Sequence, residues 1–512
     1  MNTIKLKAGM PDDANRDYLP EEIKGSDIVV NENGNNSQPY PKRLKEYHGQ
    51  LVDGQENTWY EYVPEKYDGS RPVPLIVSNH GGLMNGWGQC IYSGWSLLAD
   101  REGFIVVYPS STVPGFWQVV LPEDDHGGDR IDGKLVPRPQ KDMSKNPDMQ
   151  FLLKLIAHME EKYNIDPGRI FMQGMSMGNM MTSQFAHYYG YLLAGAAGSA
   201  GAAPLGVLFD KKGNLINEGG PLDIWETRPE NNGFGVRTHD KEAALDKYNR
   251  FYWMKINECD PIPEIRIEGE DNFAFYKGKK ADLVFLDVKN RDHGQTLDEA
   301  FLYWDFLFSG TRREADGTIT YGKTRIPRQG DTCAAAFEAG TAKVWWHNQV
   351  QELSQAPVRW QKLKYHGLNG GQKVRGEYTM VPVQFLAEMA GGTYLPSEDT
   401  LTAEIQLPDG RTCQFARGSI GCLIDDQLRS MYCEALHRNG ELLVSVEWFA
   451  KYILGLQVSI CNDIVYVTDH WAELSYLCAD LIKDIFRGFT MPEDFTHLEH
   501  IRFFGDPEKT DD

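Results

Sequence analysis

One serine, held between two glycine turns, constrains this 512-residue chain more than any other feature. The segment 174–178 reads Gly-Met-Ser-Met-Gly, and it is the only stretch of the chain with glycine, serine and glycine at this spacing. It follows the apolar run 169–173 and precedes a helical pattern with apolar residues at 177, 180, 181 and 185. Glycines at both ends permit a tight turn that lifts the serine oxygen clear of a sheet. The setting predicts a strand, a sharp turn and a helix, with Ser176 as a nucleophile.

Strand and helix patterns alternate around this turn. Apolar runs predict strands within 75–82, 103–111, 169–174, 192–203 and 281–289. The segment 148–165 carries the stripe of an amphipathic helix, and Asn146-Pro147-Asp148 supplies its start signal. Such alternation predicts an α/β fold with a mostly parallel sheet and helices on both faces. Together with the serine turn, it favours the α/β-hydrolase fold.

A serine hydroxyl becomes a good nucleophile only when a neighbouring base removes its proton. In α/β-hydrolases the chain order is serine, then Asp or Glu, then histidine in a loop after the last strand. His293 meets this condition because it follows the strand predicted at 281–289 and precedes the helical stretch 297–308. His239 is its one serious competitor, and we expect His293 to be the base.

The acid that orients the histidine should lie just past the preceding strand, which we place within 219–235. Glu230 lies at the end of that segment and is our choice. Asp223, Glu226 and Asp240 are its rivals. A glutamate can do the same orienting work as an aspartate, with a longer reach.

The turn after the first predicted strand reads His80-Gly81-Gly82. Glycine lets the backbone approach a substrate closely, so an N–H of Gly81 or Gly82 can stabilise a tetrahedral oxyanion. The N–H of Met177 is expected as the second donor. His80 is a candidate brace or substrate contact.

Three tryptophans, at 87, 95 and 117, are candidates for an aromatic wall against an aryl acyl group. Trp87 and Trp117 are our choices for substrate binding. The competing interpretation, tryptophans in the core, is equally open.

The alternating texture ends near residue 312, and a different organisation follows. We divide the chain into a polar extension (1–45), the hydrolase domain (46–312), a linker (313–339), an accessory domain (340–485) and a tail (486–512). The accessory domain contains an internal sequence repeat: VPVQFLAEMAGG, beginning at residue 381, matches VSVEWFAKYILG, beginning at residue 444, with an offset of 63 residues. A duplicated supersecondary unit in a small α+β domain is therefore expected.

Charge narrows the class of partner. There are 52 Lys and Arg against 73 Asp and Glu, which gives a formal net charge of −21. This acidity argues against nucleic acid and against anionic membranes as partners. No secretory signal and no long apolar span is evident, so we expect a cytoplasmic protein.

The eight cysteines show no metal-ligand spacing, and no cofactor or metal is expected. We expect scattered reduced thiols. Five of the cysteines lie after position 400, which leaves a disulfide in that part of the chain possible.

The region from about 46 to 310 resembles the polyhydroxybutyrate-depolymerase and feruloyl-esterase group of α/β-hydrolases. The resemblance depends on the strand ending at Asn79 to Gly82 and on 99–111, Asp148, 163–181 and 292–307. It implies Ser176 as nucleophile and His293 as base. The group's usual acid segment, a histidine-glycine turn followed by an Asp, is missing, and TRPENNG (227–233) stands in its place. One alignment puts Glu230 at the acid position, and a shift of two residues puts Asn232 there instead.

The part from about 340 to 470 looks like the stalk-type domain related to the N-terminal domain of copper amine oxidases, which also contains duplicated units. That resemblance does not imply copper, because no His/Cys cluster with ligand spacing is present. We expect such a domain to pack on the hydrolase or to serve binding or assembly, which makes a homo-oligomer possible.

The resemblance implies a serine carboxyl-ester hydrolase acting on a small-molecule or oligosaccharide ester. Feruloyl or other plant-polysaccharide esters are the favoured substrates, and hydroxybutyrate polymers or oligomers are the alternative. A non-catalytic binding protein on a hydrolase scaffold is the competing hypothesis from another class, supported by the irregular acid segment.

Overall fold

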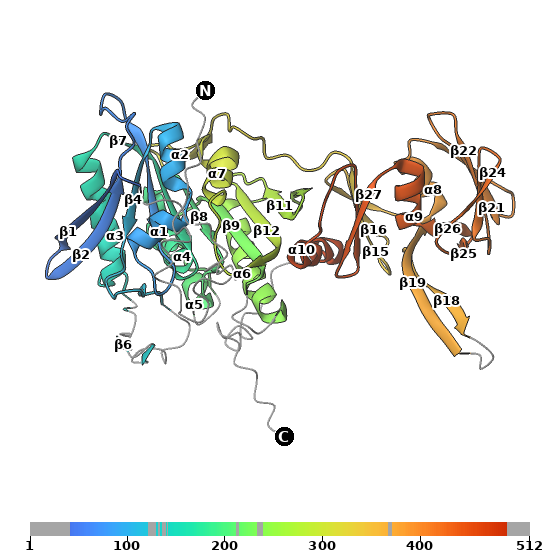
Figure 1. Cartoon of the computed structure of the whole chain (residues 1–512), viewed down its shortest axis with the longest axis horizontal. Coiled ribbons are helices and arrows are strands. Elements are labelled where there is room, and N and C mark those ends of the chain that lie inside the picture. The colour runs from blue at the N-terminus through green and yellow to red at the C-terminus, as the bar shows by residue number, and fades with distance from the viewer. Residues whose placement is uncertain are drawn as a thin grey trace, which may run out of the picture. The chain divides into compact units, whose positions relative to one another are not determined.

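The computed structural model describes residues 41–120, 130–131, 134–135, 140, 142–210, 214–232, 239–366 and 371–488. The chain divides into two compact units (Figure 1). Among the described residues, the first unit takes in those up to Pro261 together with Phe275–Arg328. The second takes in Ile262–Ala274 and the residues from Gln329 onward.

The first unit is built on a twisted sheet in which the strand order runs β1-β2-β4-β3-β7-β8-β9-β12. β1 and β2 join antiparallel, and the strands from β4 to β12 pair in parallel. The strands are β1 (Leu44–Val52), β2 (Gln55–Tyr62), β3 (Val73–Asn79), β4 (Ile105–Pro109), β7 (Ile165–Met175), β8 (Gly195–Ser199), β9 (Asp223–Asn231) and β12 (Leu283–Asp292). The expected α/β-hydrolase architecture is confirmed, because parallel strands with intervening helices form this sheet.

Helices connect the parallel strands and cover the sheet (Figure 1). They are α1 (Gly86–Tyr92), α2 (Trp95–Glu102), α3 (Pro147–Lys162), α4 (Met177–Tyr189), α5 (Leu205–Leu208), α6 (His239–Asn257) and α7 (Glu299–Tyr303), with short turns at η3 (Gly190–Leu192) and η4 (Trp304–Phe308). α3 begins as its sequence predicts, since the Asn146 side chain accepts a hydrogen bond from the Met149 N–H and Pro147 is its first residue. Phe151, Leu152 and Leu155 then face the core.

The stretch expected as a linker, 313–339, carries secondary structure in both units. β13 (Thr311–Arg313) and β14 (Ile319–Tyr321) form a hairpin, and Arg328 pairs with Asp282 at 2.6 Å within the first unit. β15 (Ala334–Glu338) belongs to the second unit. The second unit also contains β10 (Glu264–Glu268) and the first part of β11 (Asp271–Tyr276), which lie within the range expected for the hydrolase domain.

The second unit is rich in short antiparallel strands. Three sheets have the orders β17-β16-β15-β28-β27, β18-β19-β26-β25 and β20-β21-β22-β23-β24. The strands are β16 (Lys343–Trp346), β17 (Gln349–Glu352), β18 (Val358–His366), β19 (Gly371–Pro382), β20 (Thr393–Pro396), β21 (Thr402–Gln406), β22 (Thr412–Ala416), β23 (Gly421–Ile424), β24 (Gln427–Ser430), β25 (Leu436–Arg438), β26 (Glu441–Ser445), β27 (Gln457–Cys461) and β28 (Ile464–Thr468). The helices are α8 (Val383–Met389), α9 (Val446–Phe449) with its continuation η5 (Ala450–Leu454), and α10 (Tyr476–Arg487).

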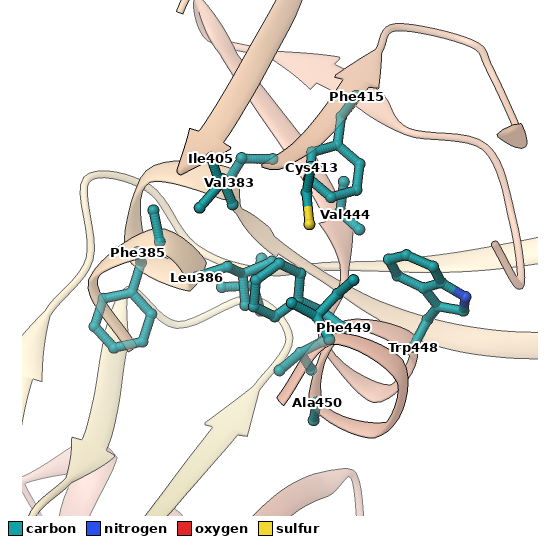
Figure 2. Close-up of a cluster of buried hydrophobic side chains, with 14 of the residues drawn as sticks. Val383, Phe385, Leu386, Ile405, Cys413, Phe415, Val444, Trp448, Phe449 and Ala450 are labelled. Atoms are coloured by element: carbon teal, nitrogen blue, oxygen red, sulfur yellow. The ribbon is translucent and has the colours of Figure 1, made fainter. Parts of the chain in front are cut away.

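The 63-residue repeat has a structural counterpart. Each copy is a strand followed by a helix, β19 then α8 in the first and β26 then α9 in the second. The two strands pair antiparallel with Val381 opposite Val444, which are equivalent positions of the two copies. Because an antiparallel pair of equivalent residues is related by a local two-fold axis, the two copies face each other about this pair. The repeated apolar positions of both helices pack into one core, together with Ile405, Cys413 and Phe415 (Figure 2).

All eight cysteines lie in the described ranges, where no disulfide joins them. Five of them are buried and three are partly exposed. The redox state of these cysteines stays a prediction.

Within the described ranges, no helix combines the length and the apolar character needed to cross a bilayer. Within the same ranges, no group of three or more His, Cys, Asp or Glu residues is arranged to hold a metal ion.

Candidate active site

Ser176 occupies the sharp turn between β7 and α4. Its backbone is strained, with φ 54° and ψ −121°, and its N–H donates to the Ser199 carbonyl at 2.8 Å. Both flanking glycines are required by contact. A Cβ on Gly174 would lie 2.1 Å from the Gly178 carbonyl oxygen, and one on Gly178 would lie 2.4 Å from the carbonyl oxygen of Asn79. The local sequence therefore builds a turn that only this glycine spacing allows.

His293 lies directly after β12, and its imidazole reaches the serine. The distance from His293 Nε2 to Ser176 Oγ is 2.8 Å, which is hydrogen-bond contact. Burial lowers the pKa of His293, so the ring is neutral at neutral pH and can accept a proton. The next residue is held in place as well, because Ser199 Oγ donates to the Gly294 carbonyl at 2.8 Å.

Asn232, and not Glu230, lies beside the other ring nitrogen. Asn232 Oδ1 is 2.7 Å from His293 Nδ1, whereas Glu230 Oε2 accepts a hydrogen bond from the Asn290 N–H at 3.1 Å. The register between β9 and β12 explains this correction. Asn231 pairs with Asp292 after a shift in register, so the next residue of each strand, Asn232 and His293, stand level with each other. Glu230 is one step too early.

The rival acids have other partners. Asp223 lies at the start of β9, opposite the end that carries Asn232, and it accepts a hydrogen bond from the Thr311 hydroxyl at 2.7 Å. Glu226 is buried in the middle of β9, where its carboxyl accepts a hydrogen bond from the Asn179 side chain at 2.8 Å. Burial raises the pKa of Glu226 to about 8. The side chains of His239 and Asp240 lie outside the described residues.

An asparagine at this position selects the tautomer of the neutral imidazole. If its Oδ1 accepts the hydrogen bond from Nδ1–H, Nε2 carries no proton and can accept one from Ser176. This is the tautomer that a general base requires. The amide supplies orientation without the negative charge of a carboxylate. The geometry thus supports a Ser-His-Asn relay with distances of 2.8 Å and 2.7 Å.

The expected oxyanion donors lie on the segments that meet at the serine turn. Met177 is the first residue of α4, and the first N–H groups of a helix have no acceptor within it. The segment carrying Gly81 packs against the same turn, because a Cβ on Gly81 would lie 2.8 Å from the sulfur of Met175. A Cβ on Gly82 would meet nothing within 4 Å, so this backbone is open. The arrangement is suited to binding an oxyanion from two sides.

His80 and Trp117 brace the oxyanion segment from behind. His80 is fully buried, with Nδ1 donating to the Gly81 carbonyl at 2.7 Å and Nε2 accepting from the Ser111 N–H at 3.0 Å. Burial lowers the pKa of His80 to about 4, which keeps Nε2 an acceptor. The Trp117 indole N–H donates to the His80 carbonyl at 2.8 Å, and its ring is buried against His80. Neither side chain is placed to contact a substrate, which corrects that expectation for both.

A buried carboxylate holds the loop that carries these contacts. Asp148, in the first turn of α3, accepts hydrogen bonds from the N–H groups of Thr112 at 2.8 Å and Gln118 at 2.6 Å. Burial raises the pKa of Asp148 to about 6. The family resemblance pointed to Asp148, and its contacts now explain what it does.

The other two tryptophans differ in exposure. Trp95 is fully buried and donates to Gln173 Oε1 at 2.9 Å, so it belongs to the core. Trp87, the second residue of α1, is 42% exposed, and it remains a candidate for contact with substrate.

A buried glutamine network under the site was not foreseen. Gln295, two residues after the histidine, accepts from Gln173 Nε2 at 3.1 Å and donates to Gln89 Oε1 at 3.1 Å. Gln173 Oε1 in turn accepts from the Ser78 hydroxyl at 2.8 Å. These bonds tie the histidine loop to the nucleophile strand β7, to β3 and to α1. The sequence held one signal for this network, because Gln173 is a polar residue inside an otherwise apolar strand.

Comparison with known proteins finds sequence similarity to acetylxylan esterases, feruloyl esterases and a poly(3-hydroxyalkanoate) depolymerase. A bifunctional acetylxylan esterase/xylanase of Neocallimastix patriciarum is 27% identical over 252 residues, which is 48% of this chain and 32% of that protein. Feruloyl esterase B of Thermothelomyces thermophilus is 27% identical over 150 residues, or 28% of this chain and 44% of that one. The chain is homologous to these esterases. Poly(3-hydroxyalkanoate) depolymerase C of Paucimonas lemoignei is also 27% identical, over 145 residues, or 28% of this chain and 30% of that one.

The resemblance stated for the hydrolase region is therefore confirmed. The chain spans less than half of the length of each of these curated relatives. Among solved structures, an acetyl xylan esterase from Aspergillus awamori matches with a TM-score of 0.36 and 18% identity, over 51% of this chain and 97% of that chain. No protein-family model matches the sequence. The resemblance of the second unit to a stalk-type domain stays a prediction.

Proposed function

We propose that this protein is a serine carboxyl-ester hydrolase that works through an acyl-enzyme. The observation that carries the proposal is the contact of His293 with Ser176 on one side and Asn232 on the other, at 2.8 Å and 2.7 Å. Nucleophile, base and orienting group are the three parts that ester hydrolysis by a serine needs. The homology to esterases supports the same reaction class.

In the first half of the reaction, Ser176 Oγ attacks the ester carbonyl carbon while His293 Nε2 takes the hydroxyl proton. The N–H groups of Met177 and of Gly81 or Gly82 bind the oxyanion that forms. When the tetrahedral intermediate collapses, the bond to the alcohol oxygen breaks, and His293 gives its proton to the departing alkoxide.

In the second half, water attacks the acyl-serine. His293 Nε2 takes a proton from the water, the oxyanion forms again, and the bond to Ser176 Oγ breaks as the serine recovers its proton. During both halves, the Asn232 amide oxygen keeps the imidazole oriented. The products are an alcohol and a carboxylic acid.

As substrate class we propose esters of plant polysaccharides, with feruloyl esters first and hydroxybutyrate oligomers as the alternative. The relatives support this range, since their names include acetylxylan esterase, feruloyl esterase and poly(3-hydroxyalkanoate) depolymerase. The proposed partner is thus a small-molecule or oligosaccharide ester.

The test is ester hydrolysis by wild type and by Ser176→Ala, with Ser144→Ala as the control. Ser144 is an exposed serine whose hydroxyl donates to the Asp142 carboxylate. We expect wild type and Ser144→Ala to release p-nitrophenol from short acyl esters at equal rates, and Ser176→Ala to lose the activity by at least a thousandfold. Methyl ferulate, acetylated xylan and hydroxybutyrate oligomers would then rank the substrate classes. If wild type is as inert as Ser176→Ala on every ester, the protein is a binding protein on a hydrolase scaffold and the proposal fails.

A further inference from the structure

Leu83 has two properties that are each unfavourable. Its backbone lies in the left-handed region with φ 61°, which L-residues with a large side chain seldom adopt. Its side chain is also 64% exposed, so the leucine gains little from burial. Glycine or asparagine would satisfy the same turn at lower cost. The stability of this turn therefore does not explain a leucine at this position.

The position of Leu83 is fixed beside the proposed oxyanion donors. It follows Gly82 directly, and two peptide units keep its Cα within about 7 Å of the Gly81 Cα. Its N–H donates to the Gly115 carbonyl at 2.8 Å, and a Cβ on Gly115 would lie 3.1 Å from the Leu83 Cα. Both contacts are with Gly115, so they hold the backbone of Leu83 against the loop that carries this glycine.

Other strained residues lie in the segments that form the same site. Ser176, Ala200 and Asn290 also have positive φ. The residue after Ala200 packs on the serine, since a Cβ on Gly201 would lie 2.4 Å from the Ser176 carbonyl oxygen, and Asn290 contacts Glu230 next to the relay. Backbone strain concentrates where a structure positions functional groups. Nine further non-glycine residues with positive φ lie elsewhere among the described residues, and six of these nine are Asn or Asp, which adopt this region more easily than leucine does.

We propose that Leu83 is a specificity-determining residue that contacts the acyl group of the substrate and favours large apolar or aromatic acyl groups over acetyl. The inference depends on the proposed ester hydrolysis. A leucine next to the oxyanion donors lies beside the carbonyl carbon, and an aromatic acyl group would cover its exposed surface. Trp87, four residues further and itself 42% exposed, extends the same segment with an aromatic face.

Two substitutions separate the side chain from the strain. Leu83→Ala removes the apolar contact and keeps a Cβ at positive φ, whereas Leu83→Gly removes both. We expect both variants to lose about 10- to 100-fold in kcat/KM on methyl ferulate and less than about twofold on p-nitrophenyl acetate. Leu83→Gly should also melt about 2 °C higher than Leu83→Ala, because glycine adopts this φ without steric conflict.

The control is Leu428→Gly, since Leu428 is a leucine of similar exposure, at 71%, in strand β24 of the second unit. We expect Leu428→Gly to leave unchanged the ratio of kcat/KM on methyl ferulate to kcat/KM on p-nitrophenyl acetate. We also expect that this variant does not melt at a higher temperature than the wild type. A series of esters with one acyl group and several alcohols tests whether Leu83 contacts the acyl part or the alcohol part of the substrate. Losses that follow the alcohol, or equal losses on ferulate and acetate, would overturn the proposal while the serine hydrolase activity stands. The Ser176→Ala variant tests only the proposed ester hydrolysis, so its loss of activity neither supports nor contradicts the role of Leu83.

Discussion

At the scale of single residues, the relay depends on an amide where a carboxylate is usual. A carboxylate beside an imidazole does two things: it fixes the tautomer, and it stabilises the imidazolium that forms when the serine gives up its proton. Asn232 can do the first through its 2.7 Å contact with His293. It lacks the negative charge needed for the second. The base is therefore oriented but less strongly favoured in its charged form.

This difference predicts the effect of Asn232→Asp. A negative charge at Nδ1 favours the protonated imidazole and raises the pKa of His293, which burial now lowers. Because the base must be neutral to act, the acid limb of the kcat/KM profile should move to higher pH. Above that limb, kcat should rise roughly tenfold as the imidazolium gains a partner. Ester hydrolysis measured from pH 4 to 9 checks both effects.

Glu230→Gln is the matched control, since it removes the carboxylate two residues before Asn232 and leaves Asn232 in place. We expect its pH profile to follow that of the wild type. Asn232→Ala should lose about a hundredfold in kcat because nothing then holds the tautomer. The reverse outcome, a large loss in Glu230→Gln and none in Asn232→Ala, would return the orienting role to the glutamate.

At the scale of elements, α3 and the loop after β4 cooperate to hold the oxyanion segment. Asp148 at the start of α3 binds two backbone N–H groups of that loop, and the loop in turn binds His80 through the Ser111 N–H and the Trp117 indole. His80 donates to the carbonyl of Gly81. A continuous set of hydrogen bonds thus runs from a helix terminus to the proposed oxyanion donors.

Asp148→Asn tests this arrangement. An amide has one acceptor oxygen, so one of the two N–H groups, of Thr112 or of Gln118, would face an NH₂ group instead of an acceptor. We expect the free energy of unfolding to fall by about 1–3 kcal/mol and kcat to fall more than KM changes, because the oxyanion donors lose their support. Urea unfolding and steady-state kinetics measure the two effects. The exposed Asp142→Asn, just before α3, should change neither by much, and an equal effect in both variants would contradict the prediction.

Two of the three site residues could be predicted from signals that lie close to them in the sequence. The glycines around Ser176 and the strand before His293 predicted these two positions because each signal is local in the chain. The third member depends on the register between β9 and β12, and a bulge between Val288 and Asp292 changes that register. Nothing local in the sequence announces such a bulge, so Glu230 and Asn232 could not be separated. The glutamine network was missed for a similar reason, since Gln89, Gln173 and Gln295 meet only after the sheet forms.

At the scale of the whole molecule, the two compact units do not follow the chain in order. Residues 262–274 belong to the second unit although they precede β12 of the first. Their contacts are made with distant residues of their own unit: the Gly269 N–H donates to the Trp471 carbonyl at 3.0 Å, and the Ile267 N–H donates to Asp331 at 3.0 Å. The domain boundary near 312 was predicted from the end of the alternating strand and helix patterns. Such a change of pattern cannot reveal that an earlier segment, 262–274, belongs to the second unit.

Acid–base behaviour of the whole protein follows from carboxyls buried in the first unit. Glu226 has its pKa raised to about 8 and Glu299 has its pKa raised to about 7, in both cases chiefly by burial. A carboxyl whose folded pKa is raised binds its proton more tightly in the folded state than in the unfolded state. Its stabilising contribution is complete below the unfolded pKa, near 4.5, and is lost as the pH rises through the folded value.

We therefore expect the first unit to become more stable as the pH falls from 8 to 6. Glu226→Gln removes one titrating group and keeps the hydrogen bond from Asn179, so the gain in stability over this range should shrink by about 1–2 kcal/mol. Relief of repulsion within a chain of net charge −21 also favours the lower pH, but it acts equally on both proteins. The comparison consequently isolates Glu226. Calorimetry at each pH measures the transition, and a covalent serine inhibitor identifies the one that belongs to the first unit. As a control, Glu388→Gln changes an exposed position of α8 in the second unit and should reproduce the wild-type change in stability with pH. If Glu226→Gln also shows the wild-type change in stability with pH, the Glu226 carboxyl is already ionised at pH 6 and the prediction is wrong.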